Sequence, residues 1–434
     1  DEYTGEKIGS KLERIREKMK ENGCNAHILS SLDDIAWLLN IRGNDIAYCP
    51  LVLSYAIVYN NSVELFADIR KFSDDIINLL AENQVKIYPY EDIYRKVSEM
   101  TSEDKLLLDS AIMNYSLYQA ISKETVIVDK QNPEILMKSV KNETQAENLR
   151  KAHLKDAVAH TKFMYWLKKN IGRMEITELS ASAKLEELRA EQEHFLGPSF
   201  GPISAYGEHG AIVHYSADEK SNVPLKEGKL FMTDTGGHYL EGSTDITRTV
   251  ALGEVGNTEK EHFTLVARAM LRLANTVFLY GCSGANLDCI AREVFWKEGL
   301  NFNHGTGHGV GYLLNIHEGP INFRWKEGER PAPALEENMV ITDEPGIYIE
   351  GSHGIRLENE LLVRKTVKNE YGQFMNFEIL TYVPIDLDAI LPEKMSTEEK
   401  EMLNHYHKQV YEKVSPYLSE EERIWLKEYT RAVK

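Results

Sequence analysis

Three histidines lie within one glycine-rich segment, residues 302–320, which reads FNHGTGHGVGYLLNIHEGP. They are His304, His308 and His317. An imidazole can bind a metal ion, transfer a proton near neutral pH, or be an ordinary buried side chain. The chemistry of this segment therefore depends on which other residues the fold brings to it.

Two known motifs share part of this spacing, and the intervening residues exclude both. A dinucleotide-binding GxGxxG loop needs glycine at position 310, where this chain has Val310, and it needs a strand before it and a helix after it. The His304–His308 spacing equals that of HExxH, but the intervening Gly-Thr-Gly disfavours a helix and lacks the glutamate. We predict neither a dinucleotide-binding loop nor a zincin site.

Two aspartates flank the glycines of the segment FMTDTGGHYLEGSTDITRT, residues 231–249. A hairpin at these glycines could bring Asp234 and Asp245 face to face, and Asp245 would share one strand face with Thr247 and Thr249. Aspartate beside glycine is also common in plain turns, and taken alone these two residues fit that interpretation better.

Two glutamates occur in the segment ITDEPGIYIEGSHGIRLENELLV, residues 341–363. Glu344 precedes a proline, which favours extended backbone. Glu358 lies in an alternating pattern typical of a half-buried strand, and taken alone it fits the solvated face of that strand. We interpret their neighbours Asp343 and Glu360 as solvated residues of this kind.

The ordered set resembles the metal ligands of the pita-bread metallopeptidases, a group that includes methionine aminopeptidase, prolidase and aminopeptidase P. The flanking residues match too: STDITRT, HGTGHGVG, TDEPG and GIRLEN. The resemblance implies a metal site built by Asp234, Asp245, His308, Glu344 and Glu358.

Charge explains why such a set needs metal. Four clustered carboxylates repel one another, and some would stay protonated at neutral pH. Two divalent cations nearly balance four carboxylates and a bridging hydroxide, whereas one cation does not. Oxygen-rich ligation with one imidazole favours Mn²⁺, with Zn²⁺ or Co²⁺ as alternatives. A metal pair can hold a bridging water and polarise a scissile carbonyl.

Within this group the chain is most similar to aminopeptidase P, in its large cytosolic three-domain form. The segments that carry this similarity include DDIAWLLNIRGNDIAYCP, GPISAYGEHGAIVHYSA and FEILTYVPID. EYTGEK, residues 2–7, resembles the start of the second domain of those enzymes, so we expect the first domain to be missing from this sequence. The resemblance implies hydrolysis of the N-terminal Xaa-Pro bond of peptides, a cytoplasmic location and a homodimer.

The resemblance also implies roles for individual residues. His214 matches a histidine that contacts the substrate near the scissile carbonyl. His317 matches one that helps to stabilise the tetrahedral intermediate or handles the leaving-group proton. His304 matches a histidine beside the metal site, and Arg356 matches an arginine that orients the metal-binding carboxylates. Glu344 would act as general base while remaining a ligand.

Three alternatives differ in substrate or class. Prolidase has the same ligands but cleaves only Xaa-Pro dipeptides. Methionine aminopeptidase usually has a single domain, which the N-terminal region of this chain disfavours. A non-catalytic pita-bread module that binds peptides would have lost its ligands, and this chain keeps five.

The elements that carry these residues predict an α+β protein in two domains. Residues 1–132 alternate helix and strand signals, beginning with a helical spacing of Leu12, Ile15 and Met19 capped near Gly23. Short apolar segments then predict strands, and the resemblance makes this a creatinase/prolidase-like mixed α/β domain. These segments are LVLSYAIVY, SVELFAD, VKIYPY, KLLLDS and TVIVD.

Residues 133–434 predict the catalytic pita-bread domain. A long charged helix is expected over residues 143–169, followed by antiparallel hairpins between further helices. Capping boxes at Ser396 and Ser419 open helices in a C-terminal extension over residues 390–434.

Composition is consistent with this division. A chain of 434 residues with 42% hydrophobic residues exceeds the usual size of a single core. Its formal net charge of −18 disfavours nucleic acid and anionic membranes as partners, and no apolar run is long enough to cross a bilayer. The four cysteines show no metal or disulfide spacing, which favours a reducing compartment.

Overall fold

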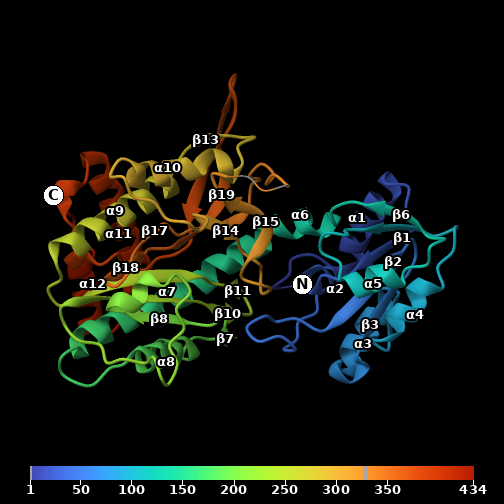
Figure 1. The fold of residues 1–434 in the computed structure, drawn as a ribbon, viewed down its shortest axis with the longest axis horizontal. Coiled ribbons are helices and arrows are strands. Elements are labelled where there is room, and N and C mark those ends of the chain that lie inside the picture. The colour runs from blue at the N-terminus through green and yellow to red at the C-terminus, as the bar shows by residue number, and fades with distance from the viewer. Residues whose placement is uncertain (1, 327, 329) are drawn as a thin grey trace. The chain divides into compact units, whose positions relative to one another are not determined.

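The computed structural model describes residues 2–326, 328 and 330–434, which divide into two compact units (Figure 1). Unit 1 covers residues 1–138 and unit 2 covers residues 139–434. Across the described residues, no helix is long and apolar enough to cross a membrane.

Unit 1 is a mixed sheet with helices packed against it. Its described strands are β1 (Ala26–Leu29), β2 (Ser54–Tyr59), β3 (Val63–Ala67), β4 (Val85–Tyr88), β5 (Lys105–Leu108) and β6 (Val126–Asp129), in the order β4-β3-β2-β1-β5-β6. Its described helices are α1 (Ile8–Glu21), α2 (Leu32–Leu39), α3 (Asp74–Glu82), α4 (Asp92–Ser98), α5 (Tyr115–Ala120) and α6 (Pro133–Ser139), the last ending at the unit boundary. A hairpin at Asn60-Asn61 joins β2 to β3, two of the predicted strands, whereas β1 was not expected from the sequence.

A buried ion pair lies beneath this sheet. His27 Nε2 lies 3.1 Å from Glu134 Oε2, and His27 Nδ1 lies 3.0 Å from the carbonyl oxygen of Leu107. Burial alone would lower the pKa of His27, but the charge and hydrogen bond of Glu134 outweigh it and raise that pKa. Glu134 therefore favours the protonated form of His27 in the core of unit 1.

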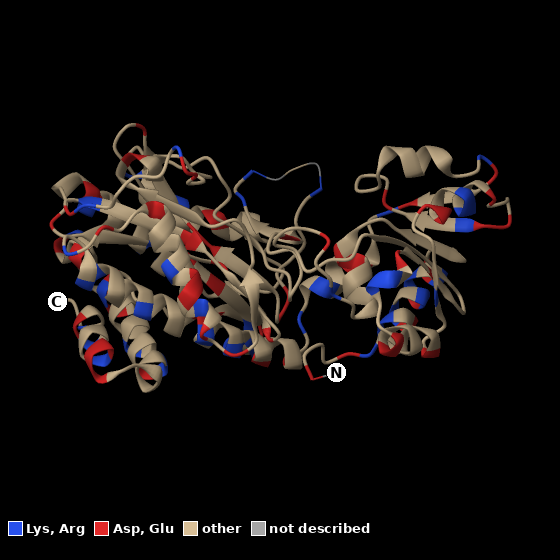
Figure 2. Ribbon diagram, turned by 90° about the horizontal axis from the view of Figure 1, so that it is seen from below, with Lys and Arg blue, Asp and Glu red and all other residues tan. Residues whose placement is uncertain are grey.

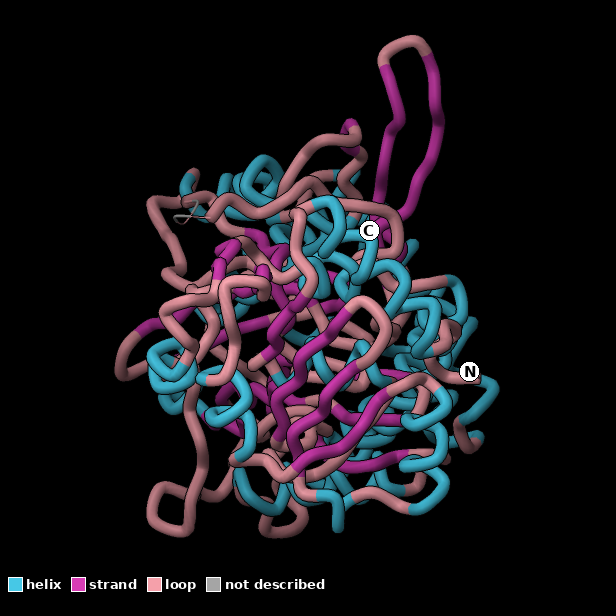
Figure 3. Tube along the Cα trace, turned by 90° about the vertical axis from the view of Figure 1, so that its right-hand side faces the viewer, coloured by secondary structure: helices cyan, strands magenta, loops and turns pink. Residues whose placement is uncertain are grey.

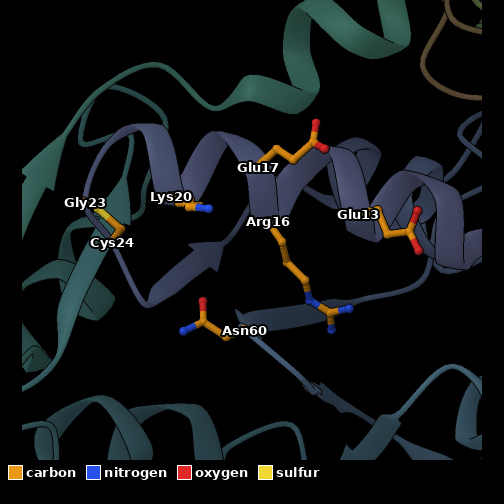
Figure 4. Close-up of a pocket in the computed structure, with 7 residues that line it drawn as sticks. All are labelled: Glu13, Arg16, Glu17, Lys20, Gly23, Cys24 and Asn60. Atoms are coloured by element: carbon orange, nitrogen blue, oxygen red, sulfur yellow. The ribbon is translucent and has the colours of Figure 1, made fainter.

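The surface of unit 1 carries an open groove of about 530 Å³ beside α1 (Figure 4). Arg16 lines it and donates through Nε to the carbonyl oxygen of Tyr59. The lining residues are Glu13, Arg16, Glu17, Lys20, Gly23, Cys24 and Asn60. Their two acids and two bases give no net charge, and no candidate site residue lies there.

Unit 2 combines long helices with antiparallel sheets, so the α+β expectation is confirmed. Its described helices are α7 (Glu143–Asn170), α8 (Glu178–Ala190), α9 (Asn257–Ala274), α10 (Gly284–Trp296), α11 (Thr397–Val414) and α12 (Glu420–Tyr429). The expected capping boxes at Ser396 and Ser419 open α11 and α12.

The strands of unit 2 form small sheets whose edges meet around the candidate site. One sheet has the order β12-β9-β8, another β11-β10-β7, a third β17-β18, and the largest β13-β20-β19-β16-β14-β15. Their bounds are β7 (Phe195–Pro198), β8 (Ile203–Tyr206), β9 (Lys229–Thr235), β10 (Gly237–Tyr239), β11 (Gly242–Ser243), β12 (Ile246–Leu252), β13 (Phe278–Leu279), β14 (Gly307–Gly309), β15 (Glu318–Phe323), β16 (Val340–Asp343), β17 (Gly346–Ile349), β18 (His353–Arg356), β19 (Asn359–Asn369) and β20 (Gly372–Ile379).

Basic and acidic residues are interspersed along the helices of each unit (Figure 2). The hairpin of β19 and β20 extends out of the body of unit 2 (Figure 3), and Val367 and Tyr371 near its tip are exposed. Its inner half is buried, and that half continues into the candidate site.

Candidate metal centre

The two aspartates lie on one hairpin. Asp234 is on β9, opposite Thr247 of β12, and Asp245 directly precedes β12. Both side chains are buried. Gly236 permits the backbone around Thr244 to approach it closely, because a Cβ at position 236 would collide with the carbonyl of Thr244. The hairpin thus directs both carboxylates to one place.

His308 lies on β14, between β15 and β16. Its backbone N–H donates to Thr342 Oγ1 at 3.0 Å, and its ring Nδ1 lies 2.8 Å from the carbonyl oxygen of Gly309. That carbonyl can only accept, so Nδ1 carries the proton and Nε2 keeps a free lone pair. A Cβ at Gly307 would collide with the carbonyl of Thr342, so glycine is required for this packing.

The two glutamates lie at strand ends that face the aspartate hairpin. Glu344 follows β16, and its N–H donates to the carbonyl of Thr306 at 2.8 Å. Glu358 lies between β18 and β19, where its N–H donates to the carbonyl of Thr247 and its Oε2 accepts from Thr247 Oγ1 at 2.7 Å. Thr247 therefore joins the hairpin to the last glutamate.

These donors form one cluster. Ligand atoms lie within 4.8 Å of one another in three overlapping groups: Asp245, His308 and His317; His308, Glu344 and Glu358; and Asp234, Asp245 and Glu358. His308 Nε2 lies 3.5 Å from Asp245 Oδ2 and 3.7 Å from Glu344 Oε1. Asp234 Oδ1 is buried without a hydrogen-bond partner among the described residues. An orphaned carboxylate oxygen within an oxygen-rich donor set fits a divalent cation.

The pKa values of the clustered carboxylates also favour bound cations. Burial and the charges of Asp234 and Glu344 raise the pKa of Asp245 well above its usual range. Burial and Asp245 do the same to the pKa of Glu358, and burial also raises the pKa of Glu344. Carboxylates this close resist joint ionisation, and bound cations would remove that repulsion.

A polar chain connects Asp234 to His304. Arg356 donates through Nε and Nη2 to Asp234 Oδ2 and through Nη1 to the hydroxyl of Tyr348 at 2.8 Å. The same hydroxyl lies 2.8 Å from His304 Nε2. Burial lowers the pKa of His304 to about 4, so this imidazole is neutral at pH 7. Arg356 is fully buried and holds one oxygen of the candidate ligand Asp234.

Sequence comparison identifies the family. The model of metallopeptidase family M24 matches residues 147–365, which contain every residue of the cluster. The chain belongs to metallopeptidase family M24. Models of the creatinase/prolidase N-terminal domain and of the C-terminal region of peptidase M24 match residues 1–145 and 373–433. The expectation of a creatinase-like domain followed by a pita-bread domain is therefore confirmed.

Individual relatives of this M24 chain are similar over its whole length. Aminopeptidase P1 of Arabidopsis thaliana is 34% identical, and the match covers 100% of this chain and 74% of that protein. The crystal structure of X-prolyl aminopeptidase from Caenorhabditis elegans, described as a cytosolic enzyme with a di-nuclear active site, is 34% identical with a TM-score of 0.93. It covers 100% of this chain and 72% of that chain. Xaa-Pro dipeptidase from Bacillus anthracis is 25% identical with a TM-score of 0.69, covering 88% of this chain and 99% of that chain.

The remaining predicted histidines of this M24 chain lie around the cluster. His317 lies beside His308, with ring centroids 4.4 Å apart and the rings tilted by 49°, and burial together with His308 lowers the pKa of His317 to about 4. His214 is exposed, and the carbonyl of the preceding Val213 accepts from Arg356 Nη2 at 3.4 Å. His308 and His317 also line a groove of about 390 Å³ that continues past Pro320 to Arg324.

Two residues that we interpreted as solvated are fully buried, so that interpretation is wrong. Asp343 and Glu360 both have 0% exposure, because the sheet of β16 and β19 is covered on both faces. Glu360 Oε1 accepts the backbone N–H of Asp245 at 2.7 Å. Thr247, which was expected on the face of Asp245, donates to Glu358, whereas Tyr348, which bonds to Arg356 and His304, was not expected. Tyr348 lies four residues after Glu344 in an extended segment, so the two side chains face the same side. This spacing was the sequence signal that could have identified Tyr348.

Proposed function

We propose that this chain is a metal-dependent aminopeptidase that releases the N-terminal residue of peptides with proline in second position. The observation that carries this proposal is the convergence of Asp234, Asp245, His308, Glu344 and Glu358 in one cluster of an M24 fold. The names of its relatives, Xaa-Pro and X-prolyl aminopeptidases, support the substrate class.

The five clustered residues would hold two divalent cations, with Mn²⁺ as the preferred ion and Zn²⁺ or Co²⁺ as alternatives. When bound, the cations supply Lewis acidity towards the scissile carbonyl and lower the pKa of the attacking water. The similarity to the Caenorhabditis elegans enzyme, which has a di-nuclear active site, supports this stoichiometry.

The chain's own residues would orient the substrate and move the protons. Glu344 accepts the proton of the attacking water, because its carboxylate lies at the mouth of the cluster beside His308. His317 and His214 stabilise the tetrahedral intermediate and assist protonation of the proline nitrogen, which lacks an N–H and must gain a proton before it leaves. His304 holds Tyr348 in place and Arg356 holds Asp234 in place, each through a hydrogen bond.

Prolidase activity is the second candidate, since an Xaa-Pro dipeptidase shares the fold at 25% identity. The Mn²⁺-loaded protein should be assayed with an Xaa-Pro dipeptide and with a tripeptide such as Arg-Pro-Pro, each with and without chelator. Cleavage of the tripeptide that chelator abolishes is the expected result. Cleavage of the dipeptide alone would favour prolidase. Absence of both bound metal and activity would favour a non-catalytic peptide-binding module.

The proposal extends to the setting of the enzyme. We propose that the protein is cytoplasmic, which the cytosolic relative supports, and that it binds neither nucleic acid nor membrane, which the acidic net charge of −18 supports. The homodimer that we propose rests on the family resemblance alone. We also propose that the N-terminal domain ends at residue 132, and that residues 390–434 form a helical extension of the catalytic domain. Gel filtration with light scattering tests the dimer.

A further inference from the structure

Helix α7 turns a polar face into the core of unit 2. His153 and Asp156 on this face both have 0% exposure. Residues three apart share one face of a helix, so the two side chains reach neighbouring parts of the same target. A helix that buries charged groups needs partners for them, since an unpaired buried charge is strongly unfavourable. Both side chains find those partners beside Asp245.

His153 reaches Asp245 through Glu360. His153 Nε2 lies 3.1 Å from Glu360 Oε2, and Glu360 Oε1 accepts the N–H of Asp245 at 2.7 Å. Within the described part of the chain, neither Glu360 Oε2 nor either ring nitrogen of His153 makes a hydrogen bond, so the 3.1 Å approach is a close polar contact without hydrogen-bond geometry. Both side chains are fully buried. Among the described residues, the one hydrogen bond that either side chain makes is the bond that Glu360 Oε1 accepts from the Asp245 N–H.

Asp156 holds the residue before Asp245. It accepts from Thr244 Oγ1 and from Arg189 Nε, each at 2.5 Å. Thr244 Oγ1 in turn accepts the N–H of Gly237 at 2.9 Å, which fixes the hairpin turn. Helix α7 therefore contacts Thr244 directly through Asp156, and it reaches Asp245 indirectly through His153 and Glu360.

We propose that His153 and Glu360 are positioning residues that fix the backbone of Asp245 so that its carboxylate faces the other metal ligands. This inference rests on the proposed function, because it takes Asp245 to be a ligand. The carboxylates around Asp245 repel it in the metal-free protein, so the direction of its Cα–Cβ bond must be set by other contacts. Groups behind the ligands commonly change metal affinity by about 10–100-fold when they are removed.

The chain supplies a matched control at the other end of β12. Asp386 is buried, accepts the N–H of Ala251 at 2.8 Å, and pairs with Lys168 of α7 at 2.8 Å. This arrangement repeats that of Glu360, with a buried acid between α7 and a backbone N–H of the same hairpin. Ala251 lies far along β12 from the ligands, so Asp386 shares the structural role without the positioning role.

The test is calorimetric titration of the metal-free protein with Mn²⁺, together with thermal unfolding of the same variants without metal. Glu360→Leu should weaken Mn²⁺ binding by about 10–100-fold. Glu360→Gln keeps an acceptor for the Asp245 N–H and should restore most of that affinity. Asp386→Leu should lower the unfolding temperature and leave Mn²⁺ affinity unchanged. The kcat of Glu360→Leu at saturating Mn²⁺ should recover, while its activity at limiting Mn²⁺ should not.

His153 has its own test by coupling. His153→Leu should weaken Mn²⁺ binding, and the double variant His153→Leu/Glu360→Leu should bind no more weakly than Glu360→Leu alone. Additive losses would show that His153 does not act through Glu360 and would overturn its part of the inference. If Glu360→Leu does not fold, His153→Leu carries the test, and unchanged affinity overturns the inference.

Failure of the inference differs from failure of the proposed function. Equal losses of Mn²⁺ affinity in Glu360→Leu and Asp386→Leu, or unchanged affinity in Glu360→Leu, would overturn the positioning role while the wild-type protein still binds metal. Wild-type protein that binds no Mn²⁺ would instead overturn the metal site itself.

Discussion

Arg356 gives both hydrogen bonds from Nε and Nη2 to the same oxygen of Asp234, Oδ2, and leaves Oδ1 without a hydrogen-bond partner among the described residues. A paired guanidinium usually takes one carboxylate oxygen with each nitrogen. Here the second oxygen stays available and points into the cluster of acids. The arginine therefore fixes the orientation of the carboxylate and neutralises part of its charge without occupying the oxygen that a cation needs.

We expect Arg356→Met to lower Mn²⁺ affinity by about 10–100-fold, because Asp234 loses the group that orients it. The unpaired buried carboxylate should also reduce the free energy of unfolding of the metal-free protein, by about 3–5 kcal/mol. Calorimetric titration and urea unfolding measure the two effects. Arg150→Met, which breaks a half-exposed pair with Glu378, is the control and should leave Mn²⁺ affinity unchanged.

Glu344→Ala should reduce kcat by at least about 100-fold at saturating Mn²⁺, because the proposed proton acceptor is removed. Far-ultraviolet circular dichroism should remain that of the wild type. Glu350, exposed at the turn between β17 and β18, provides a control, and Glu350→Ala should keep wild-type kcat. Near-normal hydrolysis by metal-saturated Glu344→Ala would contradict the assignment of the general base.

Gly236→Ala should prevent the close approach of Thr244 and reduce the free energy of unfolding by about 1–3 kcal/mol, with loss of metal binding. Gly9→Ala in α1 is the matched substitution. Its new methyl group meets only Asn83 Oδ1 at ordinary contact distance, so it should stabilise the protein by about 0.5–1 kcal/mol. Thermal unfolding compares the two, and a neutral Gly236→Ala would show that the hairpin can rearrange.

The His27–Glu134 pair should make unit 1 less stable as pH rises. The folded state raises the pKa of His27 above its unfolded value of about 6.5. The pair's contribution is therefore complete below about pH 6.5 and is lost as pH rises through the folded pKa. Hydrogen exchange of the β1 amides should be faster at pH 9 than at pH 6 after correction for intrinsic rates. His27→Gln should abolish that difference, and a persisting difference would assign it to another group.

Part of the fold could be predicted from the sequence, because short-range sequence signals specify some of its helices and strands. The apolar spacing of α1, the strand segments of unit 1 and the serine caps of α11 and α12 are short-range signals, and the structure confirms them. The four residues of β1 were missed, although the equally short β4, β5 and β6 were predicted. The M24 family was recognisable because its motifs keep their order along the chain.

The surroundings of the candidate ligands were not accessible in the same way. Glu360 lies in an alternating segment that is typical of a strand with one wet face, yet α7 covers that face and supplies His153 as a partner. The prediction for Asp343 was wrong too, because that residue is also fully buried, with Asp288 of α10 among its charged neighbours. Burial of this kind depends on tertiary packing between segments far apart in the sequence, and no local pattern reports it.

The hairpin of β9 and β12 supplies two of the clustered acids, while the other donors lie on strands that follow α9 and α10. No short fragment of this chain would therefore hold the cation pair. Metal would bind only after the β9–β12 hairpin has packed against the segments that follow α10. The free energy of metal binding then adds to the free energy of folding. Cells starved of the ion would accumulate a chain that is inactive and also more easily unfolded and degraded, so metal supply would set the enzyme's abundance as well as its rate.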